Sequence, residues 1–385
     1  MSKLNVSNLF NENEDGAPVV SGISTFSSPH YFVPPSGSTA QRPQDPGEGM
    51  IRFNTDSGHL EYYAQGYWAD VIVNNNELGG SLTGAATTFS TNGTGTRGLF
   101  AGGYSPGETN IIDYVTIETL GDAQDFGDLT AETEYPGGTS DRTRGLTLGG
   151  QTGSDAINTV SFVTIASTGN ASDFGDLINA LRQKGALANS TRAIAVGGCT
   201  TSSPFDANTV MDYFTIQSTG NGVDFGNLSA KTNYGNPTAS SVRGLFSGVS
   251  NPNGSVTTNA ISYVTISTTG DTQDFGDLSF AGSGGGGLSN STRSVIARDN
   301  NTALDFITIA TTGNALDFGS LTGNARYNTD AAVSSSTRGL FMVGAPVGNT
   351  INQIEILSTG DAIDFGDLTR SPGGDAGFSN GHGGL

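Results

Sequence analysis

Six Asp-Phe-Gly triplets and six arginines are the residues of this chain whose types and spacing could carry chemistry. The triplets begin at Asp125, Asp173, Asp224, Asp274, Asp317 and Asp364. The arginines, one ahead of each triplet, are Arg97, Arg144, Arg192, Arg243, Arg293 and Arg338. A guanidinium and a carboxylate in every copy predict one partly buried ion pair per repeat, acting as a structural staple. The alternative interpretation is a functional ring of charges.

Metal-binding and catalytic chemistry find little support among the residues. Asp122, Asp125 and Asp128 are three apart, and residues at that spacing in a strand point to opposite faces, whereas Ca²⁺ needs converging oxygens. The histidines and the single cysteine are scattered, at His30, His59, His382 and Cys199. No Ser-His-Asp set, catalytic carboxylate pair or kinase motif set accompanies the triplets. We therefore expect no enzyme activity, no metal and no cofactor.

The net charge of the chain limits the classes of partner that it is expected to bind. It carries 36 Asp and Glu against 16 Lys and Arg, a formal net charge of −20. Phosphate recognition needs a basic surface, so this balance argues against nucleic acid and against anionic membrane surfaces. No stretch of 18 apolar residues occurs, so no membrane insertion is expected. Residues 1–25 lack a signal-peptide pattern, which predicts synthesis in a cytoplasm.

The elements that position the triplets form an internal repeat. Arginines and triplets each recur roughly every 43–51 residues, a period typical of propellers and solenoids. In one copy, apolar runs separated by Gly, Asn and Ser clusters predict four strands, at 186–190, 191–198, 210–216 and 223–228. Four antiparallel strands in about 48 residues are typical of one propeller blade. Six copies predict an all-β fold with a six-bladed β-propeller over residues 81–385.

The repeat also resembles a known family. A strand ending in Gly-Gly, as at 102–103, 149–150 and 197–198, followed by an aromatic strand, resembles the kelch repeat and galactose-oxidase-like propellers. Phenylalanine replaces the kelch fourth-strand tryptophan, at Phe126, Phe174, Phe225, Phe275, Phe318 and Phe365. The resemblance implies a kelch-like propeller, and the internal period sets the blade number. We expect these phenylalanines and the third-strand aromatics to pack between blades, with Ile354 near the aromatic position of copy six.

The N-terminal region has a different character. Residues 1–48 are thinly apolar and predict an extended arm, and residues 49–80 predict a small β module and linker, with strands at 50–53, 60–63 and 67–73. The segment GMIRFNTDSGHLEYY from Gly49 to Tyr63, followed by Gly66 to Trp68, closely resembles a module in tail-fibre and other virion proteins of tailed bacteriophages, especially those of marine cyanobacteria. The resemblance implies a virion component.

The loops that differ between copies suggest where a ligand binds. In a propeller they share one face, and candidate residues for ligand or receptor binding there are Tyr104, Tyr135, Arg182, Phe205, Tyr234, Tyr327 and Arg370. We expect a homo-oligomeric tail fibre or similar appendage that attaches to other virion proteins through residues 1–80. Its propeller would bind a host-surface glycan or protein non-covalently. The alternatives are a purely structural neck, baseplate or capsid-associated component and, third, a secreted carbohydrate-active enzyme.

One more expectation concerns the chain ends. Strand-one-like segments exceed the six copies, with one at 86–90 and another at 375–379. An open sheet edge invites aggregation, so a strand from the far end of the chain should complete the first blade. We expect residues 373–382 to pair with Arg97–Gly102 and to bury Phe378. The alternative is completion by the N-terminal segment near Phe89.

Overall fold

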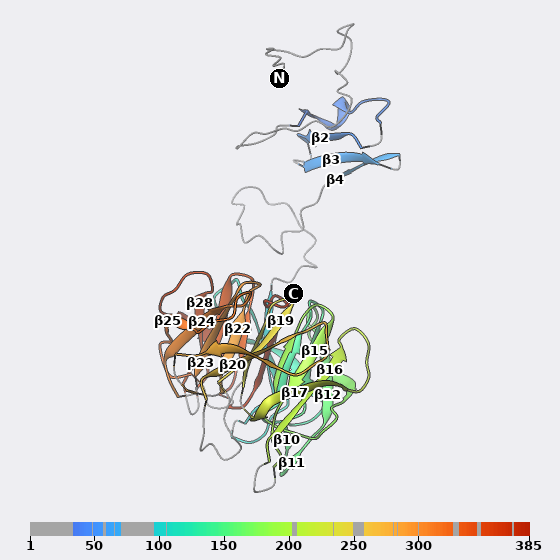
Figure 1. The fold of residues 1–385 in the computed structure, drawn as a ribbon. Helices are drawn as coiled ribbons and strands as arrows, with labels where there is room; N and C mark the ends of the chain where they lie inside the picture. The colour runs from blue at the N-terminus through green and yellow to red at the C-terminus, as the bar shows by residue number, and fades with distance from the viewer. Residues whose placement is uncertain are drawn as a thin grey trace. The chain divides into compact units, whose positions relative to one another are not determined.

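The computed structural model describes residues 34–47, 49–56, 59–64, 66–70, 96–104, 106–201, 206–233, 235–248, 258–279, 281–282, 284–298, 300–325, 331–344, 348–371 and 373–385. Within them every regular element is a strand except one short 3-10 turn, Thr39–Gln41, so the all-β prediction is confirmed. The chain divides into two compact units, Met1–Asn75 and Asn76–Leu385 (Figure 1). Most of the predicted arm and linker lies outside the described residues.

The first unit contains a four-stranded sheet in the order β1-β2-β3-β4. Its strands are β1 (Ser36–Gly37), β2 (Ile51–Asn54), β3 (His59–Ala64) and β4 (Tyr67–Asp70). The three predicted strands are present, and β1 adds a short parallel edge that periodicity could not reveal in two residues. On β2, Ile51 and Phe53 are exposed while Arg52 and Asn54 are buried, so the usual placement of apolar and polar side chains is inverted.

A charged cluster explains this inversion. The carboxylate of Glu61 is fully buried, pairs with Arg42, and lies 3.3 Å from Nε of Arg52. The side-chain amide of Asn54 donates to Glu61 Oε2 at 3.1 Å. The hydrogen bond from Arg42 is the main reason that the pKa of Glu61 is lowered from its ordinary value. Both guanidinium groups lie against the ring of Trp68, 5.9 and 6.0 Å from its centroid, so this face is held by charge and cation–π contacts.

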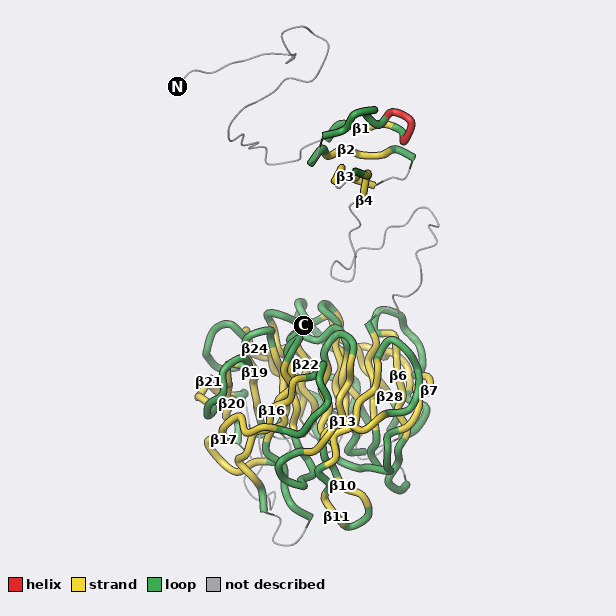
Figure 2. The backbone as a smooth tube through the Cα atoms, turned by 90° about the vertical axis from the view of Figure 1, so that its right-hand side faces the viewer, coloured by secondary structure: helices red, strands yellow, loops and turns green. Residues whose placement is uncertain are grey.

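The second unit contains six four-stranded sheets among its described residues (Figure 2). Each sheet has a first, second, third and fourth strand in antiparallel order, and its number follows the chain order of its second strand. The first strands of sheets 1 to 6 are β30 (Ala376–Ser379), β8 (Gly137–Ser140), β14 (Gly185–Ala188), β18 (Asn236–Ala239), β22 (Gly284–Ser289) and β26 (Ala332–Ser334). The second strands are β5 (Arg97–Ala101), β9 (Arg144–Leu148), β15 (Arg192–Val196), β19 (Arg243–Ser247), β23 (Arg293–Arg298) and β27 (Arg338–Met342).

The outer half of each sheet follows the same plan. The third strands are β6 (Ile111–Thr116), β12 (Thr159–Thr164), β16 (Asn208–Thr215), β20 (Ala260–Thr265), β24 (Ala303–Thr308) and β28 (Thr350–Glu355). The fourth strands are β7 (Gln124–Asp128), β13 (Ser172–Asp176), β17 (Val223–Thr232), β21 (Gln273–Asp277), β25 (Leu316–Ser320) and β29 (Ile363–Asp367). A two-stranded hairpin, β10 (Gln151–Thr152) and β11 (Asp155–Ala156), extends from sheet 2 and protrudes in both views (Figures 1 and 2).

Neighbouring sheets touch through their first strands. Contacts run in the order β8, β14, β18, β22, β26 and β30, and β30 in turn contacts β8. The residues of these strands are almost all buried. Small residues make this approach possible: a Cβ on Gly138 would lie 2.8 Å from the carbonyl oxygen of Gly377.

The C-terminal prediction is confirmed. β30 pairs antiparallel with β5, with Ala376 opposite Ala101 and Phe378 opposite Leu99. Phe378 is buried, and its ring occupies the space that a side chain on Gly145 of sheet 2 would need. The last strand of the chain therefore completes the sheet that contains the first strand of the repeat array.

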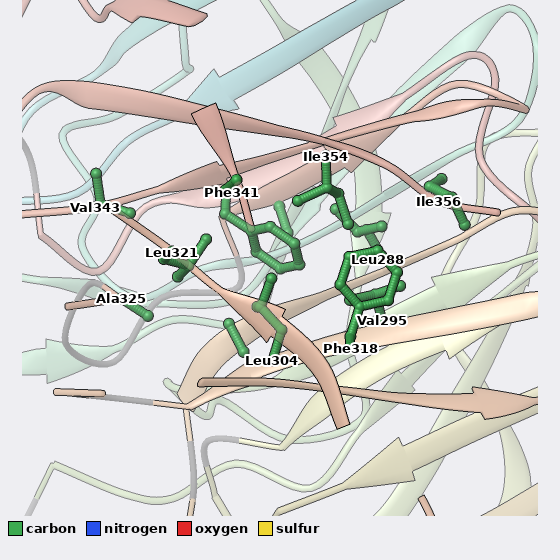
Figure 3. Packing of buried hydrophobic residues seen from close by; sticks show 13 residues of the cluster. Leu288, Val295, Leu304, Phe318, Leu321, Ala325, Phe341, Val343, Ile354 and Ile356 are labelled. Carbon is green, nitrogen blue, oxygen red and sulfur yellow. The ribbon is translucent and has the colours of Figure 1, made fainter. Parts of the chain in front are cut away.

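The hydrophobic core lies between sheets. Figure 3 shows one cluster in which Leu288, Leu304 and Phe318 of sheet 5 pack against Phe341 and Ile354 of sheet 6. Burying a side chain of this size contributes about 1.5–3 kcal/mol. The prediction that the triplet phenylalanines pack between neighbouring sheets is confirmed, because each lies in a cluster drawn from two adjacent sheets.

A repeated β-bulge turns these phenylalanines inward. In sheet 1, Ile112 pairs with Gly127 and the next residue, Asp113, pairs with Asp125, so Phe126 has no partner of its own. The ring of Phe126 packs edge-to-face on Tyr114, with the centroids 5.9 Å apart. The position equivalent to Tyr114 in sheet 6 is Gln353, opposite Leu340, and Ile354, expected near this position, is the next residue along the strand. Ile354 is instead a buried core residue.

Candidate functional site

The repeated arginines do not form the predicted ion pairs. All six triplet aspartates are exposed, and none is a salt-bridge partner of these arginines within the described residues. Each guanidinium instead donates through Nη1 to a carbonyl oxygen of a neighbouring sheet at 2.9–3.1 Å, the acceptors being Ile165, Ile216, Ile266, Ile309, Ile356 and Ile117. The ion-pair prediction is wrong because the bulge directs the aspartate outward and the phenylalanine inward.

Stacking reinforces these hydrogen bonds. In sheets 1 to 5 the guanidinium also lies 4.3–4.9 Å from the centroid of the third-strand aromatic ring. In sheet 6, Gln353 stands in place of the aromatic residue, and Nε of Arg338 lies 3.5 Å from Oε1 of Glu355 instead. The donors and acceptors advance by one sheet at a time, and Arg338 of sheet 6 reaches Ile117 of sheet 1. These arginines therefore join sheets and are not placed to bind a ligand.

A second set of contacts joins the sheets at the turns between third and fourth strands. A glycine N–H in each turn donates to the carbonyl of the triplet phenylalanine in the preceding sheet, at 2.7–3.2 Å. In sheets 5 and 6, for example, Gly360 donates to Phe318, and Asp361 Oδ1 accepts from the N–H of Ser320 at 2.9 Å. The equivalent bonds between sheets 6 and 1 run from Gly121 to Phe365 and from Asp367 to Asp122 Oδ1.

This contact explains the glycine of the triplet. Gly319 has φ +143°, and a Cβ there would lie 2.3 Å from the carbonyl oxygen of Gly360. The other five triplet glycines meet the turn of the next sheet in the same way. We call this end of the sheets, which also carries the turns between first and second strands, the turn end. The opposite end, with the loops between second and third strands and the segments linking one sheet to the next, is the loop end.

The loop end brings three of the predicted candidates together. Tyr104 is half exposed and forms backbone bridges to Glu108 and Gly373. The guanidinium of Arg182 lies 5.5 Å from the ring centroid of Tyr135. Tyr135 has φ +54°, an unusual conformation for a bulky residue, and such strain concentrates at functional positions.

Polar groups flank this pair. Arg182 donates to Gln151 Oε1 at 2.7 Å, which ties the segment before sheet 3 to hairpin β10–β11. Burial is the main reason that the pKa of Glu134 is raised, with a further contribution from Glu108. Aromatic, guanidinium, amide and carboxyl groups that lie side by side can recognise a ligand through hydrogen bonds and stacking.

The remaining candidates have different outcomes. Arg370 is not an exposed binding residue: its side chain is 9% exposed and its Nε lies 3.4 Å from Asp113 Oδ2. It caps backbone carbonyls between sheets 6 and 1, so its assignment as a ligand-binding residue is corrected. Phe205, Tyr234 and Tyr327 lie outside the described residues.

Sequence reasoning missed two buried cations at the loop end. Lys184 donates to the carbonyl of Gly197 at 2.9 Å, and burial lowers its pKa to about 8, opposed by Asp212. Arg298 stands at the end of β23 where sheets 1 to 4 carry glycine, and burial lowers its pKa to about 10, opposed by Asp305. The only sequence signal for these buried cations is the aspartate on the third strand of sheets 1, 3 and 5. An aspartate does not by itself reveal which cation faces it.

The described residues give no support for metal or thiolate chemistry. They contain no cluster of three or more histidine, cysteine, aspartate or glutamate side chains that could hold a metal ion. Burial raises the pKa of the Cys199 thiol, which disfavours the nucleophilic thiolate. They also contain no helix long and apolar enough to cross a membrane.

The chain end occupies the space between the first strands. A cavity of about 50 Å³ among them is bordered by His382, and a larger pocket of about 350 Å³ lies beside the tail residues Asn380, Gly383 and Leu385. The Nδ1 atom of His382 accepts from the N–H of Gly384 at 3.2 Å, so Nε2 donates to the Ser140 carbonyl at 2.7 Å. The tail therefore covers the turn end of this space.

Comparison with known proteins gives no further assignment. No protein-family model matches the chain, and the search of curated proteins finds no similar sequence.

Proposed function

We propose that the six sheets form a six-bladed, kelch-like β-propeller. Three observations support it: the first strands contact one another in order and β30 contacts β8, the arginine-to-carbonyl bonds advance sheet by sheet and return from sheet 6 to sheet 1, and the turn bonds do the same. Such a return is what closure of a ring requires.

The propeller is the binding part of a tailed-phage virion appendage, such as a tail fibre, which contacts a host-surface glycan or protein non-covalently. The observation that carries this proposal is the contrast between the two ends. The turn end repeats the same bonds six times, whereas the loop end presents different groups in each copy, including exposed Tyr104 and the Tyr135–Arg182 stack. Variable loops on a repeated scaffold are a common arrangement for recognition.

Residues 1–80 attach the chain to other virion proteins or to further copies of itself. The support is the apolar face of the first-unit sheet, where Ile51, Phe53, Tyr62 and Tyr67 are exposed at 54, 38, 39 and 59%. An exposed apolar face of this kind marks interaction surfaces. The same face supports a second candidate function, a purely structural virion protein whose propeller packs against neighbours.

Binding of the fluorescently labelled full-length chain to marine cyanobacterial cells tests the leading proposal. We expect saturable binding to some strains, which loses at least about tenfold in affinity in the double variant Tyr135→Ser, Arg182→Ser. The matched control is Tyr62→Ser, on the first unit. Binding to no strain tested, or binding lost only in the Tyr62→Ser control, would favour the structural role.

A further inference from the structure

A pocket of about 220 Å³ opens at the loop end between sheets 1 and 2. Its lining combines side-chain hydroxyls with aliphatic groups, and the residues that matter here are Thr130, Ala131, Thr147, Gly149, Thr159 and Ser161. No arginine, lysine, aspartate or glutamate lines it. Thr130 and Ser161 are joined through their hydroxyl oxygens at 2.8 Å.

The corresponding volume between sheets 6 and 1 is filled. There Arg370 donates to the carbonyls of Gly102 at 2.7 Å, Ile111 at 3.1 Å and Phe100 at 3.3 Å. Its charge is balanced by Asp113, whose Oδ1 also accepts from the Thr369 hydroxyl at 2.6 Å. A guanidinium from one sheet thus caps three backbone acceptors of the next.

The pocket exists because other residues stand between sheets 1 and 2 at the positions equivalent to Arg370 and Asp113. Ala131 and Arg370 each lie two residues after the leucine that follows a fourth strand, so their positions are equivalent. On the third strands, Ser161 of sheet 2 is equivalent to Asp113 of sheet 1. The positions of the three capped carbonyls, Phe100, Gly102 and Ile111, correspond to Thr147, Gly149 and Thr159, and all three of these line the pocket. The pocket therefore keeps the acceptor frame but has no cationic side chain in its lining to cap those carbonyls.

The contact between two adjacent sheets is called a seam here, and the neighbouring seam shows which ligands the pocket rejects. Between sheets 2 and 3, Lys184 donates to Gly197, the equivalent of Gly149, and Asp212 supplies the opposite charge. In sheet 2 the residue equivalent to Lys184 is Pro136, and Ser161 replaces the aspartate. A buried charge without a counter-charge is strongly disfavoured, so the pocket favours an uncharged group that donates several hydrogen bonds.

We propose that this pocket binds a single ring of a neutral sugar, the terminal unit of an uncharged glycan. Sugar hydroxyls can donate to the backbone carbonyls and exchange hydrogen bonds with Thr147, Thr159 and Ser161, while a C–H face packs on Leu129 and Pro136. The volume equals that of about seven waters and is below the roughly 300 Å³ at which drug-sized pockets begin, so one ring fits. This inference names the ligand class of the proposed binding function and rests on it.

Titration of the full-length chain with glucose, galactose and N-acetylglucosamine, followed by saturation-transfer NMR and calorimetry, tests the inference. Glucuronate and glucosamine serve as charged counterparts. We expect at least one neutral sugar to bind with a Kd on the order of 1 mM, and its charged counterpart at least about tenfold more weakly. Equal binding of charged and neutral sugars, or binding of none, would overturn it.

Two filling variants locate the site. Ala131→Leu fills the pocket without charge, and Ala131→Arg with Ser161→Asp rebuilds the pair found between sheets 6 and 1. Both should abolish sugar binding, and the second should melt close to the parent chain because its buried charges are paired. Asn179→Leu, at the position equivalent to Ala131 in the next seam, is the matched control. Sugar binding that survives both filling variants contradicts the assignment.

Cell binding separates this inference from the function proposed above. If the filling variants still bind cells as the parent chain does, and free sugar does not compete, the pocket inference fails while the host-binding function stands. If the parent chain binds sugar but no cell or purified surface polysaccharide, the pocket stands and host binding fails.

Discussion

The turn end and the loop end of the same six sheets differ in how far the chain repeats itself. At the turn end, one set of glycine, phenylalanine and asparagine or aspartate contacts recurs from sheet to sheet, and every member is tied to backbone atoms. At the loop end, three of the equivalent seams hold, respectively, Arg370 with Asp113, Lys184 with Asp212, and the neutral pocket beside Ser161. The repeated end joins the sheets, so the other end is free to vary in chemistry.

The largest effect should come from removing the strand that joins the chain ends. Deletion of residues 373–385 removes β30 and leaves one edge of β5 unpaired, so we expect aggregation or loss of the cooperative calorimetric melt. Phe378→Ala alone should cost about 3–5 kcal/mol and lower the Tm by about 10 °C. Removing residues 1–13 is the length control. Wild-type melting of the truncated chain would mean that another segment completes sheet 1.

The next effect tests the close approach at the turn end. Gly319→Ala places a Cβ against the Gly360 carbonyl, so we expect a loss of about 3 kcal/mol or more in chemical denaturation. Gly313→Ala is the control, because φ there is +154° and nothing lies within 4 Å of an added Cβ. Equal losses in the two variants would show that backbone strain alone, and not contact between sheets, requires the glycine.

A smaller effect distinguishes stacking from charge pairing at the repeated arginines. Arg192→Met removes the bond to Ile266 and the stack on Tyr213, whereas Arg338→Met loses a carbonyl bond but no ring contact. We expect unfolding free energies to fall by about 2–3 and about 1.5–2 kcal/mol, respectively. Asp224→Asn should change stability by less than about 0.5 kcal/mol. A large loss in that third variant would restore the ion-pair interpretation.

The smallest effect concerns pH. Burial lowers the pKa of His382 from its ordinary value; Asp141 opposes this shift and Arg142 adds to it. The unfolded chain therefore binds more protons than the folded one just below pH 6.5, so His382 makes stability fall as pH drops through that range. His382→Gln should flatten the dependence of Tm on pH between 7.5 and 5.5. An unchanged slope would assign the acid sensitivity to other groups.

The two ends also differ in how well sequence predicts them. Alternating apolar residues located the strands, and the Asp375–Ser379 segment predicted the partner of β5, because strand periodicity is local. The arginine contacts were mistaken because a bulge reverses which triplet residue faces inward, and register shifts leave no periodic signal. The pairing of Arg370 with Asp113 joins residues from opposite ends of the array, so only the assembled fold reveals it.

The pairing of β30 with β5 also imposes a delay on the completion of sheet 1 during synthesis. Sheet 1 lacks its first strand until residues Ala376–Ser379 have been made, and ribosomes add about 5–20 residues per second. One edge of β5 therefore stays unpaired for roughly 14–55 s after its own translation. During that interval it is an open template that a strand from another nascent chain can occupy. Slower translation of the last two sheets should raise the yield of domain-swapped or aggregated chains, whereas a circular permutant that begins at β30 should avoid the delay.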